Sequence, residues 1–403
     1  MSGLPLEGFE YPRTYRMAPW AYALTIGAAV LMLALGIGAL VLIMRAYGSS
    51  SAGLLLMSVL VLPLELLGLY LLASALRTSL VLSADAIEVH ETFRVRRLAR
   101  CDIAGRRLLK LNYGQTMTQL IPSGAGMKPF KFSQSGLRTD AFFDAWIASL
   151  PDLDAQEILA SEAQVAANAE LGATPEERMA RLAAGRKVAS ALTVISWAAA
   201  AWGYMYPHPY AAALLALALL PWLAIALAAK SAGLYRIDTR RNDVRPSVAI
   251  AIYLPGLVLL MRALQDVGVL ELQRALLYGA LTAALFCWAA VMSDAAARSK
   301  PAIVILLLAL GCPYGYGVVV LGNSQLDRAA GDHYEVNVLA RRISGGRNRS
   351  YYLTLAPWGP RSEAREVTVP RTLYANAQPG QPVCIHQGPG ALGISWYAVS
   401  SCW

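Results

Sequence analysis

Val81-Leu82-Ser83-Ala84-Asp85-Ala86-Ile87-Glu88-Val89-His90 opens a polar stretch that closes with Asp140-Ala141-Phe142-Phe143-Asp144-Ala145-Trp146-Ile147. This stretch runs from Val81 to Asp152 and separates two blocks of hydrophobic segments, so it decides how the chain is organised. The 403 residues are 56% hydrophobic and 15% charged, with a mean hydropathy of +0.44. Soluble domains carry about 25% charged residues. The composition therefore predicts a multi-pass membrane protein.

Seven apolar segments approach the length of ~20 residues that a spanning helix needs. They are Ala18–Met44, Gly53–Leu76, Val188–Met205, Pro209–Ala229, Val248–Ala263, Leu272–Met292 and Ala302–Leu321. The third segment can continue the polar helix before it, and we expect Pro255-Gly256 to break the fifth. The first is longer than the apolar core of a cleavable signal, so we expect it to remain as a span.

Basic residues gather in alternate loops, which predicts the orientation of the chain. Arg13 and Arg16 precede the first span, and Arg77 follows the second. The loops after the fourth and sixth spans are also basic, whereas the intervening loops are poorer in positive charge. By the positive-inside rule, the N-terminus lies in the cytoplasm and the C-terminus outside. An odd number of spans agrees with this arrangement.

The polar insert has the pattern of several strands followed by one helix. Apolar positions typical of strands occur at Leu80–Leu82, Ile87–Val89, Phe93–Val95, Leu108–Leu111, Met117–Ile121 and Phe130–Phe132, with turns between them. The last part, Thr139 to Leu150, has helical spacing instead. Thr139 or Asp140 can cap the start of this helix.

This order of elements, with Cys101-Asp102-Ile103-Ala104-Gly105 after the early strands, resembles the bacterial PH-like (pleckstrin homology) domain. The resemblance covers Leu80 to Leu150 and implies two orthogonal sheets closed by one C-terminal helix. The whole arrangement is similar to an uncharacterised family of bacterial multi-pass inner-membrane proteins that carry such an insert. That similarity implies no molecular activity; the orientation predicted from the basic loops places the insert in the cytoplasm and the tail in the periplasm.

The rest of the chain predicts a helical connector, a helix bundle and a second β domain. Thr174-Pro175-Glu176-Glu177 is a capping box with proline at the first helical position. In the tail, period-two patterns and turn signals predict a small closed or half-closed β-barrel. The fold class is thus a mainly α-helical polytopic membrane protein with an inserted PH-like β domain and a C-terminal β-barrel-like domain. Its parts are the N-terminal transmembrane hairpin (1–79), the PH-like domain (80–152), the connector (153–187), the five-span bundle (188–322) and the extracytoplasmic β domain (332–403).

A dense basic stretch lies within the insert and contains a single acid, Asp102. Its members are Arg94, Arg96, Arg97, Arg100, Arg106, Arg107 and Lys110. On the cytoplasmic face such a stretch could contact anionic lipid, at about 1 kcal/mol per residue near the surface, or an acidic protein partner. Alternatively, the charges sit on solvated strand positions and only set the topology. The formal charge of +9 lies largely in short loops and does not imply a nucleic-acid partner.

Two features of the predicted spans are candidate functional sites. Glu65 is the only acid deep within a span, and intramembrane carboxylates are candidates for a functional role. It has no evident partner, so a packing role is favoured over a proton relay. Pro313-Tyr314-Gly315-Tyr316-Gly317 lacks the pore helix and fourfold repetition of a potassium filter. It predicts a kinked, closely packed helix.

The cysteines predict one disulfide. Cys384 and Cys402 both lie in the tail that is expected to face an oxidising compartment, so we predict that they pair. Cys101, Cys287 and Cys312 are predicted to be free. No Cys-x-x-Cys pair supports a zinc site.

The sequence contains no linear catalytic motif. A phosphate-binding glycine loop, a HExxH motif, paired carboxylates and triad spacings are all missing, so we predict no enzymatic activity, cofactor or metal. The favoured hypothesis is an integral membrane scaffold or sensor that displays both β domains. The alternative is a transporter or channel component that uses the bundle with Glu65. Polar residues are sparse in the spans and no convincing internal repeat is present, which favours the scaffold.

Overall fold

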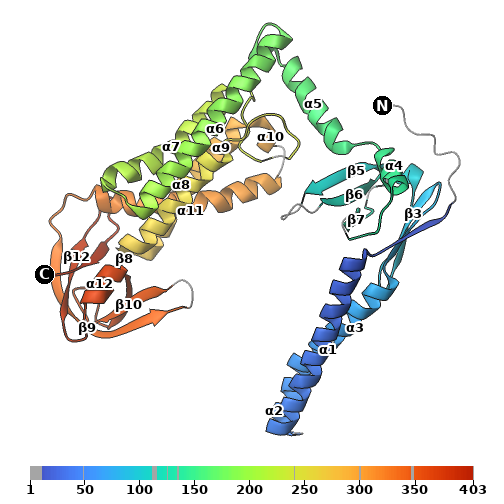
Figure 1. The fold of residues 1–403 in the computed structure, drawn as a ribbon. Coiled ribbons are helices and arrows are strands. Elements are labelled where there is room, and N and C mark those ends of the chain that lie inside the picture. Colours follow the sequence, from blue (N-terminus) through green and yellow to red (C-terminus); the bar gives the residue numbers. More distant parts are fainter. Residues whose placement is uncertain are drawn as a thin grey trace. The chain divides into compact units, whose positions relative to one another are not determined.

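The computed structural model describes residues 11–48, 50–110, 116–124, 126–133, 136–239, 241–298, 301–345 and 349–402 (Figure 1). The chain divides into two compact units, Met1–Leu159 and Ala160–Trp403. Within the described residues, seven helices are long and apolar enough to cross a membrane, which indicates a multi-pass membrane protein. They are Pro19–Tyr47, Ser51–Arg77, Pro175–Met205, Tyr210–Lys230, Ala249–Asp266, Leu272–Ser293 and Val304–Gln325.

The first two of these helices form a hairpin in the first unit. The first helix is α1 (Pro19–Tyr47), and the second consists of α2 (Ser51–Leu56), the π-helical η1 (Met57–Val61) and α3 (Leu62–Arg77). Close packing occurs at Gly68, where an added Cβ would stand 2.8 Å from the side chain of Leu33. Most other apolar side chains of the hairpin are exposed, as expected for helices surrounded by lipid.

The β domain of the first unit contains two antiparallel sheets and one helix. The four-stranded sheet has the order β1 (Arg13–Arg16), β2 (Ser79–Leu82), β3 (Ala86–His90) and β4 (Val95–Ala99). After the short η2 (Arg100–Asp102), the second sheet contains β5 (Ile103–Lys110), β6 (Thr116–Pro122) and β7 (Phe130–Ser133), followed by helix α4 (Ala141–Ala148). Phe143, Trp146 and Ile147 of α4 are buried in the same core as Leu80 and Leu120. Helix α4 therefore closes the domain, as its apolar spacing predicted.

Strand β1 was not predicted, and it changes the boundary of the domain. It precedes the first span and pairs with β2, with Arg13 opposite Leu82 and Arg16 opposite Ser79. The membrane hairpin is therefore inserted between two paired strands, and assigning residues 1–79 to the hairpin alone was wrong. The strand predicted at Phe93–Val95 was also misplaced: Glu91 and Arg94 close a turn through a 2.8 Å backbone hydrogen bond, and β4 begins at Val95.

The helical connector continues directly into the third span. Helix α5 (Leu153–Ala167) and the short η4 (Ala169–Leu171) lead to α6 (Pro175–Met205). The Thr174 hydroxyl accepts a hydrogen bond from the Glu177 N–H, as the capping box predicted. The remaining helices are α7 (Tyr210–Lys230), α8 (Ala249–Asp266), α9 (Leu272–Ser293), α10 (Ala295–Arg298) and α11 (Pro301–Gln325).

Helices α8, α9 and α11 pack closely through glycines. A Cβ on Gly315 of α11 would stand 2.2 Å from the Gly279 carbonyl oxygen, and one on Gly317 would stand 2.7 Å from the Leu259 backbone. The Pro-Tyr-Gly-Tyr-Gly segment is thus a helix-packing motif, as expected. The predicted break at Pro255-Gly256 was wrong, because Pro255 lies inside a continuous α8.

The C-terminal domain is a curled six-stranded sheet that forms a half-barrel (Figure 1). It contains β8 (Gly268–Val269), β9 (Asp332–Ser344), β10 (Ser350–Leu355), β11 (Arg365–Val369), α12 (Arg371–Asn376), β12 (Pro382–Gly388) and β13 (Trp396–Ser400). The strand order is β11-β10-β9-β12-β13-β8. This architecture agrees with the half-closed barrel expected from the alternating apolar pattern.

Strand pairing and hydrogen bonds to backbone groups join the half-barrel to the helix bundle. Strand β8, which was not predicted, comes from the loop between α8 and α9 and pairs with β13. Gly268 packs against the Tyr397 ring. A Cβ added at Gly268 would overlap a ring carbon, at 2.2 Å. At the end of α11, the buried Asn323 side chain donates to the Ile394 carbonyl and accepts from the Leu392 N–H. These bonds make the bundle and the half-barrel one compact unit.

Candidate functional site

The basic stretch of the first unit is largely neutralised by acids from elsewhere in the sequence. The Arg97 guanidinium lies 3.5 Å from the Glu88 carboxylate. Arg106 lies 3.4 Å from Asp152, and Arg107 forms an ion pair with Glu157. Asp102 is the single acid within the stretch, and the fold adds carboxylates from outside it, on β3, the α4–α5 loop and α5.

Two further arginines of the stretch are held by hydrogen bonds and aromatic rings. Arg96 donates to the Lys128 carbonyl at 2.8 Å, and its guanidinium lies 4.3 Å from the centre of the Phe130 ring. Arg100 donates to the Ser149 hydroxyl at 3.0 Å. The side chain of Lys110 lies outside the described residues. Among the described arginines of the stretch, Arg94 is the one with neither an ion pair nor a side-chain hydrogen bond.

Arg94 belongs to an exposed hairpin tip, Phe93-Arg94-Val95, that lies beside a membrane helix. Phe93 is 75% exposed and Val95 is 62% exposed. The Phe93 ring lies 6.0 Å from the Tyr70 ring of α3. Tyr70 precedes the end of α3 by about two helical turns, or about 10 Å at 1.5 Å per residue. The tip therefore lies alongside α3, about two helical turns before the end of that helix.

Asp140 ties β1 to α4 on the other side of the domain. Its carboxylate accepts hydrogen bonds from the Phe143 N–H at 2.8 Å and from the Tyr15 hydroxyl at 2.9 Å, and it lies 3.0 Å from Arg13. Burial tends to raise the pKa of Asp140, but the Phe143 N–H, Tyr15 and Arg13 together lower it. Asp140, not Thr139, is therefore the N-cap of α4, and it also fixes the strand that leads into α1.

Glu65 lies between the two helices of the hairpin. A Cβ on Gly36 of α1 would stand 2.4 Å from Oε1 of Glu65, so the glycine makes room for this carboxylate. Glu65 is only partly buried and follows the π-helical segment η1. Such segments are frequent at functional sites. Within the described residues Glu65 forms no ion pair, and its contact with Gly36 suits the packing role that was favoured.

A buried ion-pair network that the sequence did not reveal lies at one end of the helix bundle. Arg236 lies 3.0 Å from Asp243 and 2.8 Å from Asp294, and all three side chains are at least nine-tenths buried. Arg245 also binds Asp243, and the Ser161 hydroxyl donates to it. Burial opposes ionisation of Asp243, but Arg245 and Arg236 hold its pKa well below the usual range. This network clamps the α7–α8 loop to α5 and to the end of α9.

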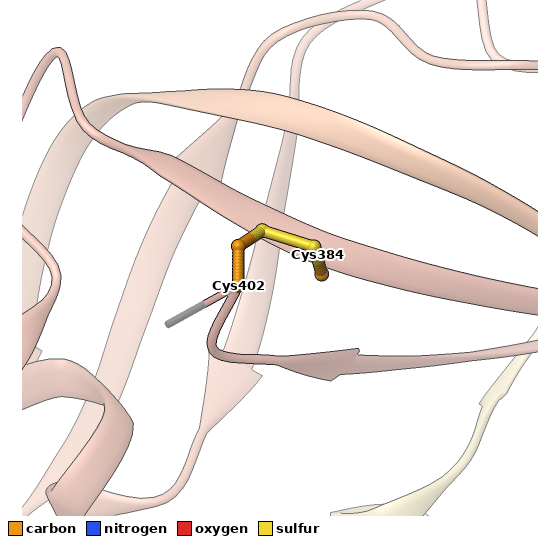
Figure 2. The surroundings of a disulfide bond; sticks show 2 residues. All are labelled: Cys384 and Cys402. Atoms are coloured by element: carbon orange, nitrogen blue, oxygen red, sulfur yellow. A yellow bond between two sulfur atoms is a disulfide. The ribbon is translucent and has the colours of Figure 1, made fainter.

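The predicted cysteine pair is joined in the half-barrel (Figure 2). Cys384 of β12 and Cys402, just after β13, form a disulfide with their Cα atoms 5.0 Å apart. Cys101 and Cys312 are free and exposed, and Cys287 is free and buried. The disulfide joins β12 to the residues that follow β13, its neighbour in the sheet.

No metal-ligand cluster is present in the part of the chain that the structure describes, because no group of three or more His, Cys, Asp or Glu side chains could hold an ion. Comparisons with protein-family models, with curated proteins and with solved structures found no match for this chain. Any functional conclusion therefore depends on the geometry of the chain itself.

Proposed function

We propose that this chain is an integral membrane scaffold or sensor that presents a β domain on each side of a bacterial inner membrane. The observation that carries the proposal is the insertion of the α1–α3 hairpin between the paired strands β1 and β2. Two covalent connections, only a few residues long, hold the first β domain against its membrane helices. Such an attachment suits a domain that presents a surface at a fixed height above the bilayer.

The first β domain is proposed to be PH-like. A four-stranded sheet and a three-stranded sheet, closed by a helix after the last strand, support this proposal. In this chain the membrane hairpin takes the place of the β1–β2 connection. An isolated domain would therefore need residues 11–17 in addition to Leu80–Asp152, because β1 completes the first sheet.

The proposed membrane contact of this domain is the hairpin tip, not the whole basic stretch. Most arginines of the stretch already have partners, whereas Arg94 is exposed between two exposed apolar side chains. One arginine near an anionic surface contributes about 1 kcal/mol. Apolar insertion by Phe93 and Val95 would add to this contribution and would depend little on salt. An acidic protein partner remains the second candidate for this surface.

A fluorescence experiment tests the membrane contact. A Phe93→Cys variant in a background with Cys101→Ser and Cys312→Ser, which removes both exposed free thiols, is labelled with an environment-sensitive dye and reconstituted in vesicles. We expect blue-shifted emission and quenching by spin-labelled lipids. A label at Ala148, on the exposed face of α4, should show neither effect, because α4 lies away from the hairpin (Figure 1). Equal quenching at both positions, or none at Phe93, would rule out the tip as the contact.

Thiol labelling tests the proposed topology, with the N-terminus in the cytoplasm and the C-terminus in the periplasm. Gly48 has a φ of 54°, so a cysteine there would be strained, and Tyr47 offers an exposed alternative as the last residue of α1. An impermeant thiol reagent should label Tyr47→Cys in intact spheroplasts and should spare Gly124→Cys until the membrane is opened. The reverse pattern would invert the proposed orientation.

A flux measurement separates the scaffold from the transporter or channel alternative. Full-length protein in proteoliposomes should pass no more protons or monovalent ions than protein-free vesicles. The Glu65→Gln variant should behave in the same way, because Glu65 packs against Gly36. A proton flux that the wild type supports and Glu65→Gln abolishes would overturn the scaffold proposal.

A further inference from the structure

The junction between the helix bundle and the half-barrel contains a cleft of about 770 Å³. Leu264 at the end of α8 and Leu272 at the start of α9 contribute apolar lining, and both are more than half exposed. The half-barrel contributes Arg361, Arg365 and Gln387. The cleft therefore combines basic groups with apolar side chains at the ends of two spanning helices, which lie at the edge of the membrane.

Arg361 is fixed in this cleft by a turn and by two aromatic rings. Its backbone N–H and carbonyl both bond to Trp358, at 2.8 and 3.1 Å. Its guanidinium carbon lies 5.7 Å from the centre of the Trp358 ring and 5.6 Å from that of Tyr397. The two rings are in edge contact with each other at 5.6 Å. Arg361 is thus oriented by cation–π contacts, without a carboxylate.

Arg365 places a second positive charge beside Arg361. It begins β11, is exposed, and forms no ion pair within the described residues. Burial lowers the pKa of Arg361, and the neighbouring charge of Arg365 lowers it further. Glu363 lies on the same loop and is exposed, but it forms no ion pair with either arginine. The two like charges are therefore close enough to repel each other.

The other nearby carboxylates are already occupied. Glu366 binds Arg342 through two hydrogen bonds of 2.7 Å each. Glu271, which lines the cleft, lies 2.7 Å from Arg274 and also accepts a hydrogen bond from the Ser395 hydroxyl. Neither acid neutralises Arg361 or Arg365, so the positive potential in the cleft is available to a ligand.

Two buried polar atoms in the cleft lack partners in the described chain. They are Nε of Arg361, a donor, and Oε1 of Gln387, an acceptor. Buried polar groups are normally hydrogen-bonded. A ligand with oxyanion oxygens next to a hydroxyl would satisfy both atoms once the two side chains rotate toward the cleft. Arginine forks match phosphate oxygens in particular, because two donors of one guanidinium bind two oxygens.

We infer that this cleft binds a phosphate ester, carried either by a lipid or by a small soluble molecule. Arg361 and Arg365 bind the phosphate oxygens, and the Gln387 carbonyl accepts a hydrogen bond from a neighbouring ligand hydroxyl. Leu264 and Leu272 provide an apolar surface for an acyl chain. This site is independent of the scaffold proposal, because it involves only the second unit.

Calorimetric titration of the purified full-length protein in detergent tests the site. The two probes are sn-glycerol 3-phosphate and a short-chain 1-acyl lysophosphatidic acid, both of which carry a free hydroxyl beside the phosphate. Each charge-assisted contact that is lost should weaken binding about tenfold. Arg365→Gln, at an exposed position, should therefore raise Kd about tenfold, and Arg361→Gln combined with Arg365→Gln about a hundredfold. The control Arg342→Gln removes an arginine that is already paired, and it should leave Kd unchanged.

The titrations show whether the site binds a phosphate ester and whether that phosphate belongs to a lipid or to a soluble molecule. Equal affinity for both probes identifies the phosphate ester alone as the ligand, whereas tighter binding of the lipid that weakens in Leu272→Asn identifies a lipid headgroup. Formation of the Cys384–Cys402 disulfide checks that each variant folds. The inference is overturned if neither probe binds the wild type, or if Arg365→Gln binds as tightly as Arg342→Gln.

Discussion

Two groups of arginines, one in each β domain, differ in whether the fold supplies them with carboxylate partners. In the first domain, a conspicuous basic stretch is matched by carboxylates that the fold brings to it from Glu88, Asp152 and Glu157. In the half-barrel, Arg361 and Arg365 do not stand out in the sequence, and yet no acid of the described chain pairs with them. The dense basic stretch thus mostly forms contacts within the protein, whereas Arg361 and Arg365 form a candidate ligand site.

The difference shows that charge available to a partner is set by pairing in space, not by density along the chain. Antiparallel strands place residues from distant positions directly opposite one another, as Arg97 and Glu88 are between β4 and β3. Such cross-strand pairs are favourable. An irregular loop such as Trp358–Arg361 has no opposing strand to supply an acid. Substitutions that remove a paired or an unpaired arginine test this difference.

The largest effect is expected for the buried arginine of the helix bundle. Arg236→Ala would remove the guanidinium that is buried between Asp243 and Asp294, and breaking a buried ion pair costs about 3–5 kcal/mol. Chemical denaturation in detergent should show this loss. The exposed pair of Arg342 and Glu366 serves as the control, since Arg342→Ala should change stability much less than Arg236→Ala does. Equal costs for the two variants would show that burial does not control the strength of these pairs.

Reduction of the disulfide should destabilise one β domain and spare the other. Cys384 and Cys402 are 18 residues apart, and a loop of this size is worth about 3 kcal/mol in the chain-entropy model. In hydrogen exchange, amides of β12 and β13 should lose protection in Cys384→Ser combined with Cys402→Ser. Amides of β2 and β3 should be unchanged. Loss of protection in both domains would argue against their independent stability.

Asp140 should stabilise the first β domain in a pH-dependent way. Its folded-state pKa is lowered, so its contribution is present above the ordinary value of 3.8 and is lost as the pH falls through the lowered pKa. Asp140→Ala should cost about 1 kcal/mol at neutral pH through loss of the N-cap. Asp140→Asn retains the cap and should cost less, with a weaker dependence on acid. An acid unfolding curve identical to the wild type in Asp140→Asn would contradict this assignment.

The smallest effect is expected within the basic stretch itself. Arg97 is 63% exposed in its pair with Glu88, and such surface pairs are worth about 0.2–1 kcal/mol. Arg97→Gln should therefore change stability by less than about 1 kcal/mol. Binding of the full chain to anionic vesicles should fall more in Arg94→Gln than in Arg97→Gln, because Arg94 has no ion-pair or side-chain hydrogen-bond partner among the residues that the structure describes. Equal losses of vesicle binding in the two variants would indicate that the whole basic stretch, and not Arg94 alone, contacts the lipid.

The sequence was sufficient to predict the spans and most of the strands. Continuous apolar runs and period-two patterns report local burial, so Leu80–Leu82, Met117–Ile121 and the helix at Thr139–Leu150 were recognised close to their final bounds. The Cys384–Cys402 pair also followed, because both cysteines lie in one small domain. Strands β1 and β8 were missed, since each is short and acquires its pairing only from a distant strand.

The site-level features were decided only by the tertiary structure. The partners of Arg106 and Arg107 lie about 50 residues away, and Arg236 meets Asp294 from another loop. Likewise, Arg361 and Gln387 share a cleft with Leu264 because β8 pairs with β13. The physical reason is that apolar periodicity depends on neighbours along the chain. Whether a charge is matched depends instead on which distant residue the folded backbone places within about 4 Å of it.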